Sequence, residues 1–375
     1  MTSEWHEVPL RELVGYISKG IAPSYAEEAS ETTIRVLNQK CNRNFRISYG
    51  DSRLHDTLKK KVPPERYVKP DDILINSTGA GTAGRIAQIE DVPSATTIDG
   101  HMILIRSNGK VTQNFLGYAL KAHQWEVLQL DEGSTGQTEL NRDRLLDEIM
   151  INYPVSFDEQ NAIVGTLESI DRKLIVNEQL NDNLQQQAQA IYSSMFIDNP
   201  DPAWSHGHLS DLITVKYGKD HKKLADGIYP VYGSGGIMRH VERPLYNKES
   251  VLIPRKGTLN NVVYVNQPFW SVDTMFYTEM KLPNVAKFVY HFVKAKDLAA
   301  MNAGSAVPSM TTDILNAMEV VIPSASALEE FESLVAPMYE AMKANDVQSQ
   351  ALSKMRDALL PKLMSGEIDV SAVRL

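Results

Sequence analysis

The chain has 375 residues, of which 43% are hydrophobic, a single cysteine and a formal net charge of −9. This length allows two or three domains with ordinary hydrophobic cores. The lone Cys41 excludes an internal disulfide framework or thiolate metal site and is interpreted as an inert side chain, and the absence of a signal peptide or membrane-spanning apolar run predicts a cytoplasmic protein that contacts no membrane.

The negative charge is concentrated in two short segments. Residues 156–200 carry 2 Lys and Arg against 7 Asp and Glu, and residues 326–375 carry 5 against 8, so together they hold −8 of the −9. Residues 1–155 (18 against 21) and 201–325 (13 against 11) are together nearly neutral. Each of these two large segments could therefore present a basic face to a nucleic acid.

Residues 1–155 are predicted to form a first mixed α and β domain. Trp5, Leu10 and Leu13 mark its beginning, and the apolar triplet at 73–75 is followed by a glycine turn and a second apolar run. The alternating run "HMILIR" at 101–106 predicts a strand, and "NFLGYALKAHQWEVL" at 114–128 predicts an amphipathic helix.

The glycine turn "GAGTAG" at 79–84 matches the G-x-G-x-x-G fingerprint of dinucleotide-binding and S-adenosylmethionine-binding folds. That fingerprint requires a helix immediately after the glycines. Here "RIAQIEDVP" alternates and reaches Pro93, which indicates a strand instead. The sequence therefore favours a flexible hairpin over a cofactor cradle.

Residues 156–197 are predicted to form a coiled-coil helix. Steps of four and three residues give a heptad seam that is interrupted only by two asparagines: Ile163, Leu167, Ile170, Leu174, Asn177, Asn181, Leu184, Ala188, Ile191 and Met195. Ser156 and Glu159 are predicted to form a capping box, and "DNPDP" at 198–202 ends the helix. The polar run "NEQLNDNLQQQAQA" is then the solvated face of this helix.

Residues 198–325 repeat the pattern of the first domain. Trp204, Leu209 and Leu212 have the spacing of Trp5, Leu10 and Leu13. The triplet at 251–253 again precedes a glycine turn, and "AKFVYHFVKAKDLAA" at 286–300 matches the helix at 114–128. The offset between the copies falls from 199 at the tryptophans to 178 at the triplets, so the first copy has about twenty extra residues, mostly within 20–70.

Residues 326–375 repeat the coiled-coil helix. A shift of 168 residues gives the seam Phe331, Val335, Met338, Met342, Asn345, Ser349, Leu352, Arg356, Leu359 and Leu363. Asn345 and Ser349 match Asn177 and Asn181, and Ser326 with Glu329 is predicted to form a second capping box. Because a seam asparagine costs stability but fixes register, Asn177 and Asn345 are predicted to set the register of the helix pair.

This organisation resembles the specificity subunit of a type I restriction–modification system. The resemblance covers essentially the whole chain and is carried by "GSTGQTELNRDRL" followed by a short strand, a proline and "DEQNAIVGTLESIDRKL", and by "YPVYGSGGI" and "IPRKGTLNNV" in the second copy. It implies an α+β fold in which two mixed α/β target recognition domains alternate with two long helices, as an internal pseudo-two-fold repeat. The helices would pair as an antiparallel coiled coil.

The same resemblance implies function and partners. Each domain would read one half of a bipartite double-stranded DNA site. The helices would dock two adenine methyltransferase subunits, and through the complex a restriction and translocase subunit. The chain would be non-catalytic and hold no cofactor or metal; S-adenosylmethionine would bind the methyltransferase, and ATP and Mg would bind the restriction subunit.

Candidate DNA contacts follow from residue chemistry in the matching loops. Arg and Lys suit guanine, Asn and Gln suit adenine, and Ser and Thr suit phosphates. In the first domain the candidates are Asn38, Gln39, Lys40, Asn42, Arg43, Ser77, Thr78, Arg85, Ser134, Thr135 and Gln137. In the second they are Lys216, Tyr217, Lys219, His221, Lys222, Lys223, Tyr232, Ser234, Arg255, Lys256, Thr258 and Asn260.

Two other functions are compatible with the sequence. One is an interaction scaffold whose repeated domains bind protein and not DNA, which a gel shift with the methyltransferase would separate from a specificity subunit. The other is an enzyme that uses the "GAGTAG" loop, which binding of S-adenosylmethionine by the isolated chain would support. The chain lacks the Asn/Asp-Pro-Pro-aromatic motif of adenine methylation, and its nine histidines show no metal-ligand spacing.

Overall fold

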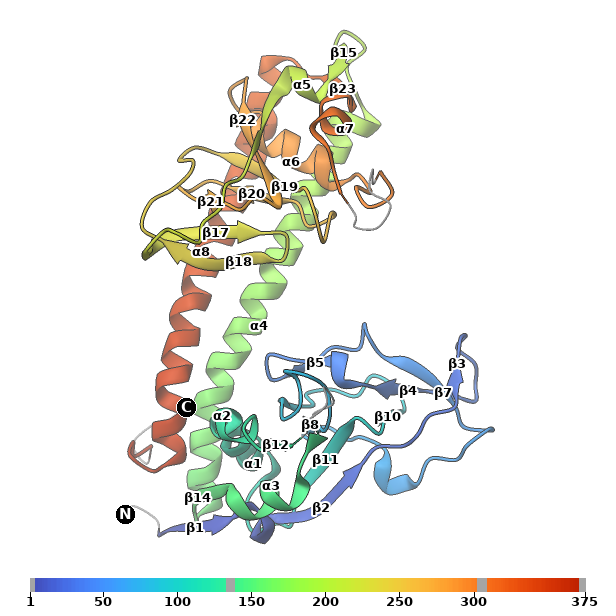
Figure 1. The fold of residues 1–375 in the computed structure, drawn as a ribbon, viewed down its shortest axis with the longest axis vertical. Helices are drawn as coiled ribbons and strands as arrows, with labels where there is room; N and C mark the ends of the chain where they lie inside the picture. Colours follow the sequence, from blue (N-terminus) through green and yellow to red (C-terminus); the bar gives the residue numbers. More distant parts are fainter. Residues whose placement is uncertain (1–3, 133–138, 302–308, 371–375) are drawn as a thin grey trace. The chain divides into compact units, whose positions relative to one another are not determined.

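The computed structural model describes residues 4–132, 139–301 and 309–370. The chain divides into two compact units: unit 1 comprises residues 1–176 and 348–375, and unit 2 comprises residues 177–347. Each unit joins one α/β domain to portions of two long helices, α4 (Phe157–Ser193) and α8 (Ala325–Met364) (Figure 1).

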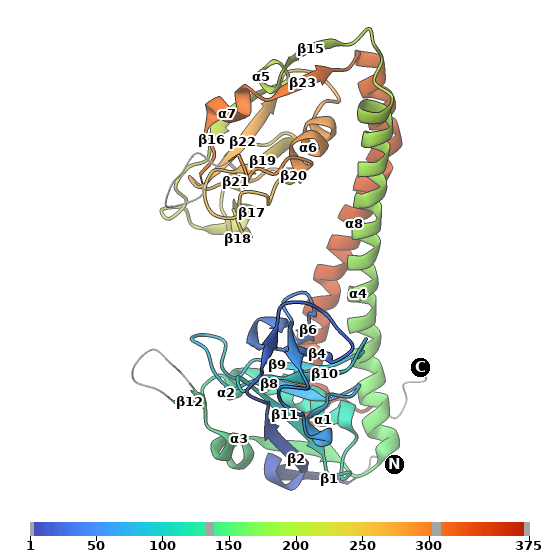
Figure 2. The ribbon, with the colours of Figure 1, turned by 90° about the vertical axis from the view of Figure 1, so that its right-hand side faces the viewer.

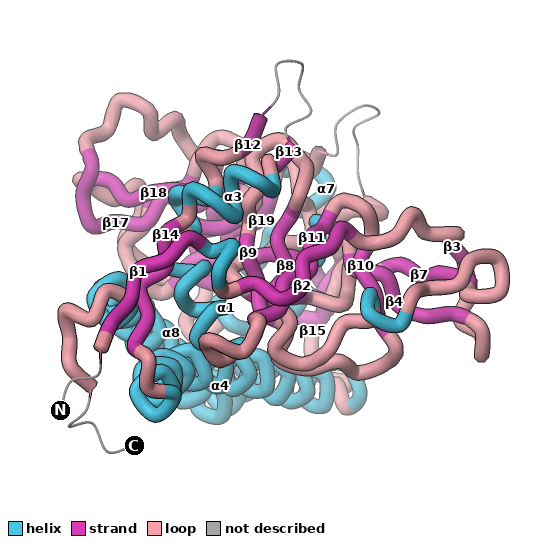
Figure 3. Tube along the Cα trace, turned by 90° about the horizontal axis from the view of Figure 1, so that it is seen from below, coloured by secondary structure: helices cyan, strands magenta, loops and turns pink. Residues whose placement is uncertain are grey.

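Unit 1 is built on a four-stranded antiparallel sheet in the order β2 (Val14–Lys19), β11 (Met102–Ser107), β8 (Ile73–Asn76), β9 (Ile86–Gln88). A second sheet has the order β10 (Thr96–Ile98), β4 (Thr33–Leu37), β7 (Arg53–Asp56), β3 (Tyr25–Ala26). Three strand pairs complete it: β1 (Trp5–Pro9) with β14 (Met150–Pro154), β5 (Asn42–Arg43) with β6 (Arg46–Ile47), and β12 (Asp131–Glu132) with β13 (Glu139–Leu140). The helices are α1 (Gln113–Ala122), α2 (Gln124–Val127) and α3 (Arg142–Glu148), and α1 lies beside the first sheet (Figure 3).

Unit 2 repeats this topology. Its main sheet has the order β16 (Ile213–Tyr217), β22 (Met275–Met280), β19 (Ser250–Pro254), β20 (Val263–Val265), and its second sheet the order β18 (Gly236–Val241), β17 (Asp226–Gly233), β21 (Trp270–Ser271). β15 (Ser205–His208) pairs with β23 (Glu319–Ile322) as β1 pairs with β14. The helices are α5 (Leu209–Leu212), α6 (Ala286–Lys294) and α7 (Thr312–Asn316), and α6 lies between the main sheet and the long helices (Figure 2).

The internal repeat predicted from the sequence is thus confirmed in the main sheets, in the strand pair beside each of them and in the helices α1 and α6. The two main sheets share strand order and direction, and α1 and α6 occupy the same place in the topology. The predicted helix at 114–128 is divided at His123 into α1 and α2, and the one predicted at 286–300 ends at Lys294. Extra strands in unit 1, β3 and the β5–β6 pair, account for the longer first copy.

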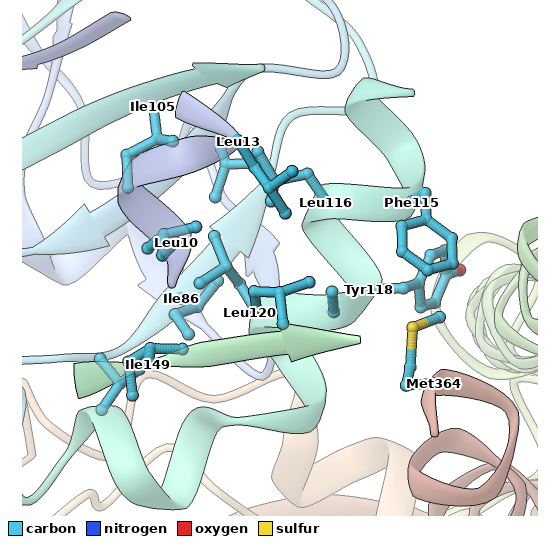
Figure 4. Packing of buried hydrophobic residues seen from close by; sticks show 14 of the residues in the cluster. Leu10, Leu13, Ile86, Ile105, Phe115, Leu116, Tyr118, Leu120, Ile149 and Met364 are labelled. Atoms are coloured by element: carbon cyan, nitrogen blue, oxygen red, sulfur yellow. The ribbon is translucent and has the colours of Figure 1, made fainter. Parts of the chain in front are cut away.

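The core of unit 1 joins its domain to the long helices. Phe115 and Leu116 of α1 are fully buried with Ile163 and Leu167 of α4 and with Leu363 of α8. Met364 of α8 lies against Phe115 and Tyr118 (Figure 4). The core of unit 2 is built in the same way from Phe288 of α6, Tyr192 of α4 and Phe331 of α8.

The long helices are antiparallel and their seam residues are buried or half-buried, as the heptad pattern predicts. Within unit 2, Asn345 Nδ2 donates to Asn181 Oδ1 at 2.8 Å, and further along α4 Tyr192 meets Phe331. Asn177, almost fully buried, donates to the carbonyl of Asn345 at 3.4 Å. These contacts place the predicted register residues together; whether they set the register stays a prediction.

Arg356 is a charged residue at a seam position, and unit 1 compensates its charge. Its guanidinium lies 3.1 Å from Asp171, which also accepts hydrogen bonds from the Lys121 ammonium and the Tyr118 hydroxyl of α1. Burial alone would raise the pKa of Asp171, but Lys121, Arg356 and Tyr118 together lower it. The cluster therefore joins the domain to both helices through one carboxylate.

One cap differs from expectation. At α4 the Ser156 hydroxyl accepts from the Glu159 amide at 3.4 Å, which is one half of the predicted capping box, and the Glu159 carboxylate accepts from Trp5 Nε1 at 3.2 Å. At α8 the Ser324 hydroxyl accepts from the Ala327 amide at 3.3 Å, so the cap lies two residues before the predicted one, Ser326, and the helix begins at Ala325. The first serine after Pro323 already caps the helix, and Ser326 falls within its first turn.

Candidate nucleic-acid interface

In unit 1 the loop that follows β4 packs against the glycine turn that joins β8 to β9. Asn42 Nδ2 donates to the carbonyl of Arg85 at 2.8 Å, and Asn76 Nδ2 donates to the carbonyl of Gln39 at 3.2 Å. Gly79 has a φ of +113°, and a Cβ there would lie 2.7 Å from Gln39 Oε1. The positive φ of the turn therefore requires glycine here, and a larger residue would also displace the Gln39 side chain.

The same two segments meet in unit 2. The turn between β17 and β18 contains Ser234, and its carbonyl accepts from Asn261 Nδ2 at 2.8 Å. Gly257, with a φ of +86°, lies so close that a Cβ would be 2.7 Å from Ser234 Oγ. In each unit, the loop that follows β4 or β17 and the glycine turn that follows β8 or β19 thus form one surface. We call this surface the loop face.

The residues just before β11 and β22 add a third segment to each loop face. The Ser77 amide donates to the carbonyl of His101 at 2.8 Å, and the Arg255 amide donates to that of Thr274 at 2.9 Å. Isolated β-bridges join Thr78 to Glu139 and Lys256 to Ser309. Ser134, Thr135 and Gln137 lie outside the described residues.

In both units, the segment that follows the first strand of the main sheet, β2 or β16, leaves the sheet at the equivalent place. Gly20 and Gly218 each pack so closely on the strand opposite, at Ile98 and Val272, that any Cβ would collide with a backbone oxygen. In unit 2 the Arg255 guanidinium lies 5.4 Å from the centre of the half-exposed Tyr217 ring. The basic segment 216–223 therefore begins beside the glycine turn at 255–261.

Most predicted contact residues reach the surface. Exposed side chains are Lys40, Arg43, Tyr217, Lys219, Lys222, Lys223, Lys256, Thr258 and Asn260. Half-buried side chains are Asn38, Gln39, Thr78, Arg85, Lys216, His221, Ser234 and Arg255.

Three predicted contacts are corrected by their burial. Asn42 and Ser77 are fully buried, and Tyr232 is 8% exposed and packs against Phe269. The Asn42 amide is committed to the carbonyl of Arg85 and to Asn76, so it holds the loop face together and presents no atom to a ligand. Asn38 and Asn260, though accessible, also use their amides internally, on Asp51 and Asp297.

Sequence reasoning missed two residues of the unit 1 loop face. His101 Nδ1 is 2.8 Å from the Thr78 hydroxyl, and the Lys19 ammonium pairs with Glu139. Both residues lie at the end of a strand. Extending the repeat alignment by one step pairs His101 with Thr274 and Lys19 with Tyr217, which would have identified them.

The chain also matches known proteins. A family model described as the type I restriction modification DNA specificity domain matches residues 2–186 and again residues 203–330. The chain belongs to this family. It is a specificity subunit, the component that gives a type I restriction–modification system its DNA sequence specificity.

Individual relatives of this specificity subunit agree over most of their length. It is 25% identical to the Type I restriction enzyme MjaIX specificity subunit of Methanocaldococcus jannaschii, over 86% of this chain and 83% of the relative. A putative type I specificity subunit of Mycoplasma genitalium is 23% identical over 66% of this chain and 70% of that protein. The crystal structure of a type I S subunit from M. genitalium shares the fold, with a TM-score of 0.60, 18% identity and 96% coverage of both chains.

Rival chemistry at the glycine turn finds no support in the geometry. β8 and β9 pair antiparallel, with Ile75 opposite Ile86, so "GAGTAG" is the turn of a hairpin, as predicted. Among the described residues no cluster of three or more His, Cys, Asp or Glu could hold a metal ion. No helix within the described ranges is long and apolar enough to cross a membrane.

Proposed function

We propose that the specificity subunit reads a bipartite double-stranded DNA site, with one loop face on each half. The observation that carries this proposal is the repetition of the loop face on equivalent backbones with different side chains. Where unit 1 has the half-buried Thr78 beside the buried Ser77, unit 2 has Arg255 and Lys256. A shared scaffold with unlike contact residues is what two half-sites of different sequence require.

The helix pair is proposed to set the separation of the half-sites and to dock two adenine methyltransferase subunits. α4 has 37 residues and is therefore about 55 Å long. That is about one and a half turns of B-DNA, enough to leave unread base pairs between two half-sites. A restriction and translocase subunit would join through the complex.

Catalysis is proposed to lie on the partners and not on this chain. S-adenosylmethionine would bind the methyltransferase, ATP and Mg would bind the restriction subunit, and the cytoplasm would be the site of assembly. The specificity subunit would supply positioning alone.

A binding experiment tests the unit 2 loop face. The Arg255→Ala/Lys256→Ala variant, assembled with its methyltransferase, should bind its DNA more weakly and with a flatter salt dependence. The log–log slope should fall by about 0.9 for each phosphate that the variant no longer neutralises. Arg243→Ala/Lys248→Ala is the matched control, because both residues are exposed and lie toward the far ends of the strands. Equal slopes for the two variants would show that Arg255 and Lys256 face solvent.

A further inference from the structure

The segment that leads from the second sheet to the main sheet is longer in the first copy than in the second. Between the end of β4 and the start of β8 lie residues 38–72, whereas only residues 234–249 lie between β17 and β19. Residues 38–72 carry nine Lys and Arg against five Asp and Glu, a net +4, and residues 234–249 carry three against two, a net +1. In a chain of net charge −9, such a local excess calls for an anionic partner.

The cations of this segment are built into one edge of the second sheet. The Arg53 guanidinium lies 3.3 Å from the centre of the Tyr25 ring, on the edge strand β3. This stacking holds the flat cation in place and leaves its N–H edges available, which suits a phosphate. Both residues are exposed at the surface.

A lysine turn, Lys59 to Lys61, is fixed beside the same strand. The buried His55 bridges the two segments: its Nδ1 accepts from the Ser24 amide at 2.9 Å, and its Nε2 donates to the carbonyl of Lys60 at 2.7 Å. The Lys60 ammonium donates to the carbonyl of Ala22 at 2.9 Å. All three lysines are exposed, and the Lys59 ammonium lies 3.7 Å from the Asp56 carboxylate.

These groups extend outward from the loop face of unit 1. Asn38, in that face, donates to the carbonyl of Asp51 at 2.7 Å, just before β7 begins at Arg53. β7 then leads to the lysine turn, so Arg53 and Lys59 are separated by about 15–20 Å of extended chain at most. That length corresponds to about five base pairs of B-DNA.

We propose that Tyr25, Arg53, Lys59, Lys60 and Lys61 form a cationic ridge that binds the phosphate backbone of DNA flanking the first half-site. The inference rests on the proposed function. The ridge contributes affinity without sequence information, and it lies on the unit that reads the first half-site. An acidic protein surface on a partner subunit is the competing occupant.

The test uses the variant Arg53→Gln/Lys59→Gln/Lys61→Gln in complex with the methyltransferase. Lys60 is kept because it bonds to the backbone. The control is Arg11→Gln/Lys69→Gln/Lys110→Gln, three exposed cations at the opposite end of the main sheet, before β2, before β8 and after β11. Equal melting temperatures of both variants and the unmodified chain establish that the folds match.

Two duplexes are compared over a range of salt: one with ten flanking base pairs beyond each half-site, and one that ends at the first half-site. On the long duplex the ridge variant should lower the log–log salt slope by about two to three, while the control leaves it unchanged. On the short duplex the ridge variant and the unmodified chain should bind alike, and the methylated sequence should stay the same.

A ridge variant with the slope of the control on the long duplex would overturn the proposal. Loss of methyltransferase during purification with an unchanged salt slope would instead assign the ridge to a protein partner and overturn it equally. Failure of the unmodified complex to distinguish its own site from unrelated DNA would overturn the proposed function itself.

Discussion

At the scale of single residues, side-chain type predicts where the loops lie but not which atoms are free. The loops at 38–43 and 255–260 are both identified by their Asn, Lys and Arg content, and the structure brings each to a loop face. The sequence could not show that Asn42 turns inward. Residue type alone does not distinguish an asparagine that donates to a backbone carbonyl from one that contacts a base.

The inward orientation of Asn42 predicts a separation of stability from binding. Asn42→Ala leaves the carbonyl of Arg85 and Oδ1 of Asn76 without this donor and should lower the free energy of unfolding by about 1–3 kcal/mol. Lys40→Ala, two residues earlier and exposed, should change that free energy by less than about 0.5 kcal/mol. Urea denaturation of the two variants measures both; a stable Asn42→Ala protein would contradict this assignment.

At the scale of elements, the heptad pattern predicts both long helices and their buried seam. It could not predict what joins each helix to its domain, because those contacts come from residues far apart in the chain. In unit 2 the buried His291 of α6 donates from Nδ1 to Gln189 of α4 at 2.8 Å, and the Tyr339 hydroxyl of α8 donates to its Nε2 at 2.9 Å. His291 of α6 and Tyr339 of α8 thus form the kind of junction that Tyr118 of α1 and Asp171 of α4 form in unit 1.

The junction at His291 predicts acid sensitivity. Burial lowers the pKa of His291 to about 4 from an ordinary 6.5, so the folded chain keeps it neutral while the unfolded chain takes up a proton. Stability should therefore fall as pH drops from about 6.5 to about 4, by at most about 1.4 kcal/mol per pH unit from this one group. The contribution of His291 to stability is fully present above about pH 6.5.

Urea midpoints measured across pH test this expectation. His291→Asn should flatten the pH dependence between pH 6.5 and 4 relative to the unmodified chain. His206→Asn, at an exposed histidine of the same unit, serves as the control and should leave the dependence unchanged. If His291→Asn kept the original slope, the histidine would be protonated in the folded protein.

The length of the helices gives a second prediction at this scale. One extra heptad in each helix keeps the seam in phase and adds about 10 Å. The unread gap should then widen by about three base pairs, with both half-sites unchanged. Two extra residues in each helix would rotate the seam and should abolish assembly. Methylation at the original gap by the heptad variant would show that the helices do not set the spacing.

At the scale of the whole molecule, tryptophan, glycine and proline positions predict the repeat of domain and helix, and the matching sheets confirm it. The decrease in the residue offset between the two copies predicts that the first copy has extra residues, but it does not predict how those residues fold. Residues 20–70 lack strong periodicity, so β3 and β5 to β7 are short and held by contacts such as the His55 bridge, which no local pattern specifies.

The two domains of the chain should read DNA independently of each other. Residues 198–325 contain the entire unit 2 loop face and all the elements of its two sheets. Exchanging this segment for that of a relative should therefore change one half of the recognition sequence and leave the other half and the gap intact.

The most direct measurement is a genome-wide map of N6-methyladenine in cells that carry the methyltransferase with no specificity subunit, with the unmodified chain, or with the 198–325 exchange. We expect a split motif to appear only with the specificity subunit, and the exchange to alter a single half of it. The same motif without the subunit, or a motif altered in both halves by the exchange, would contradict two-domain reading.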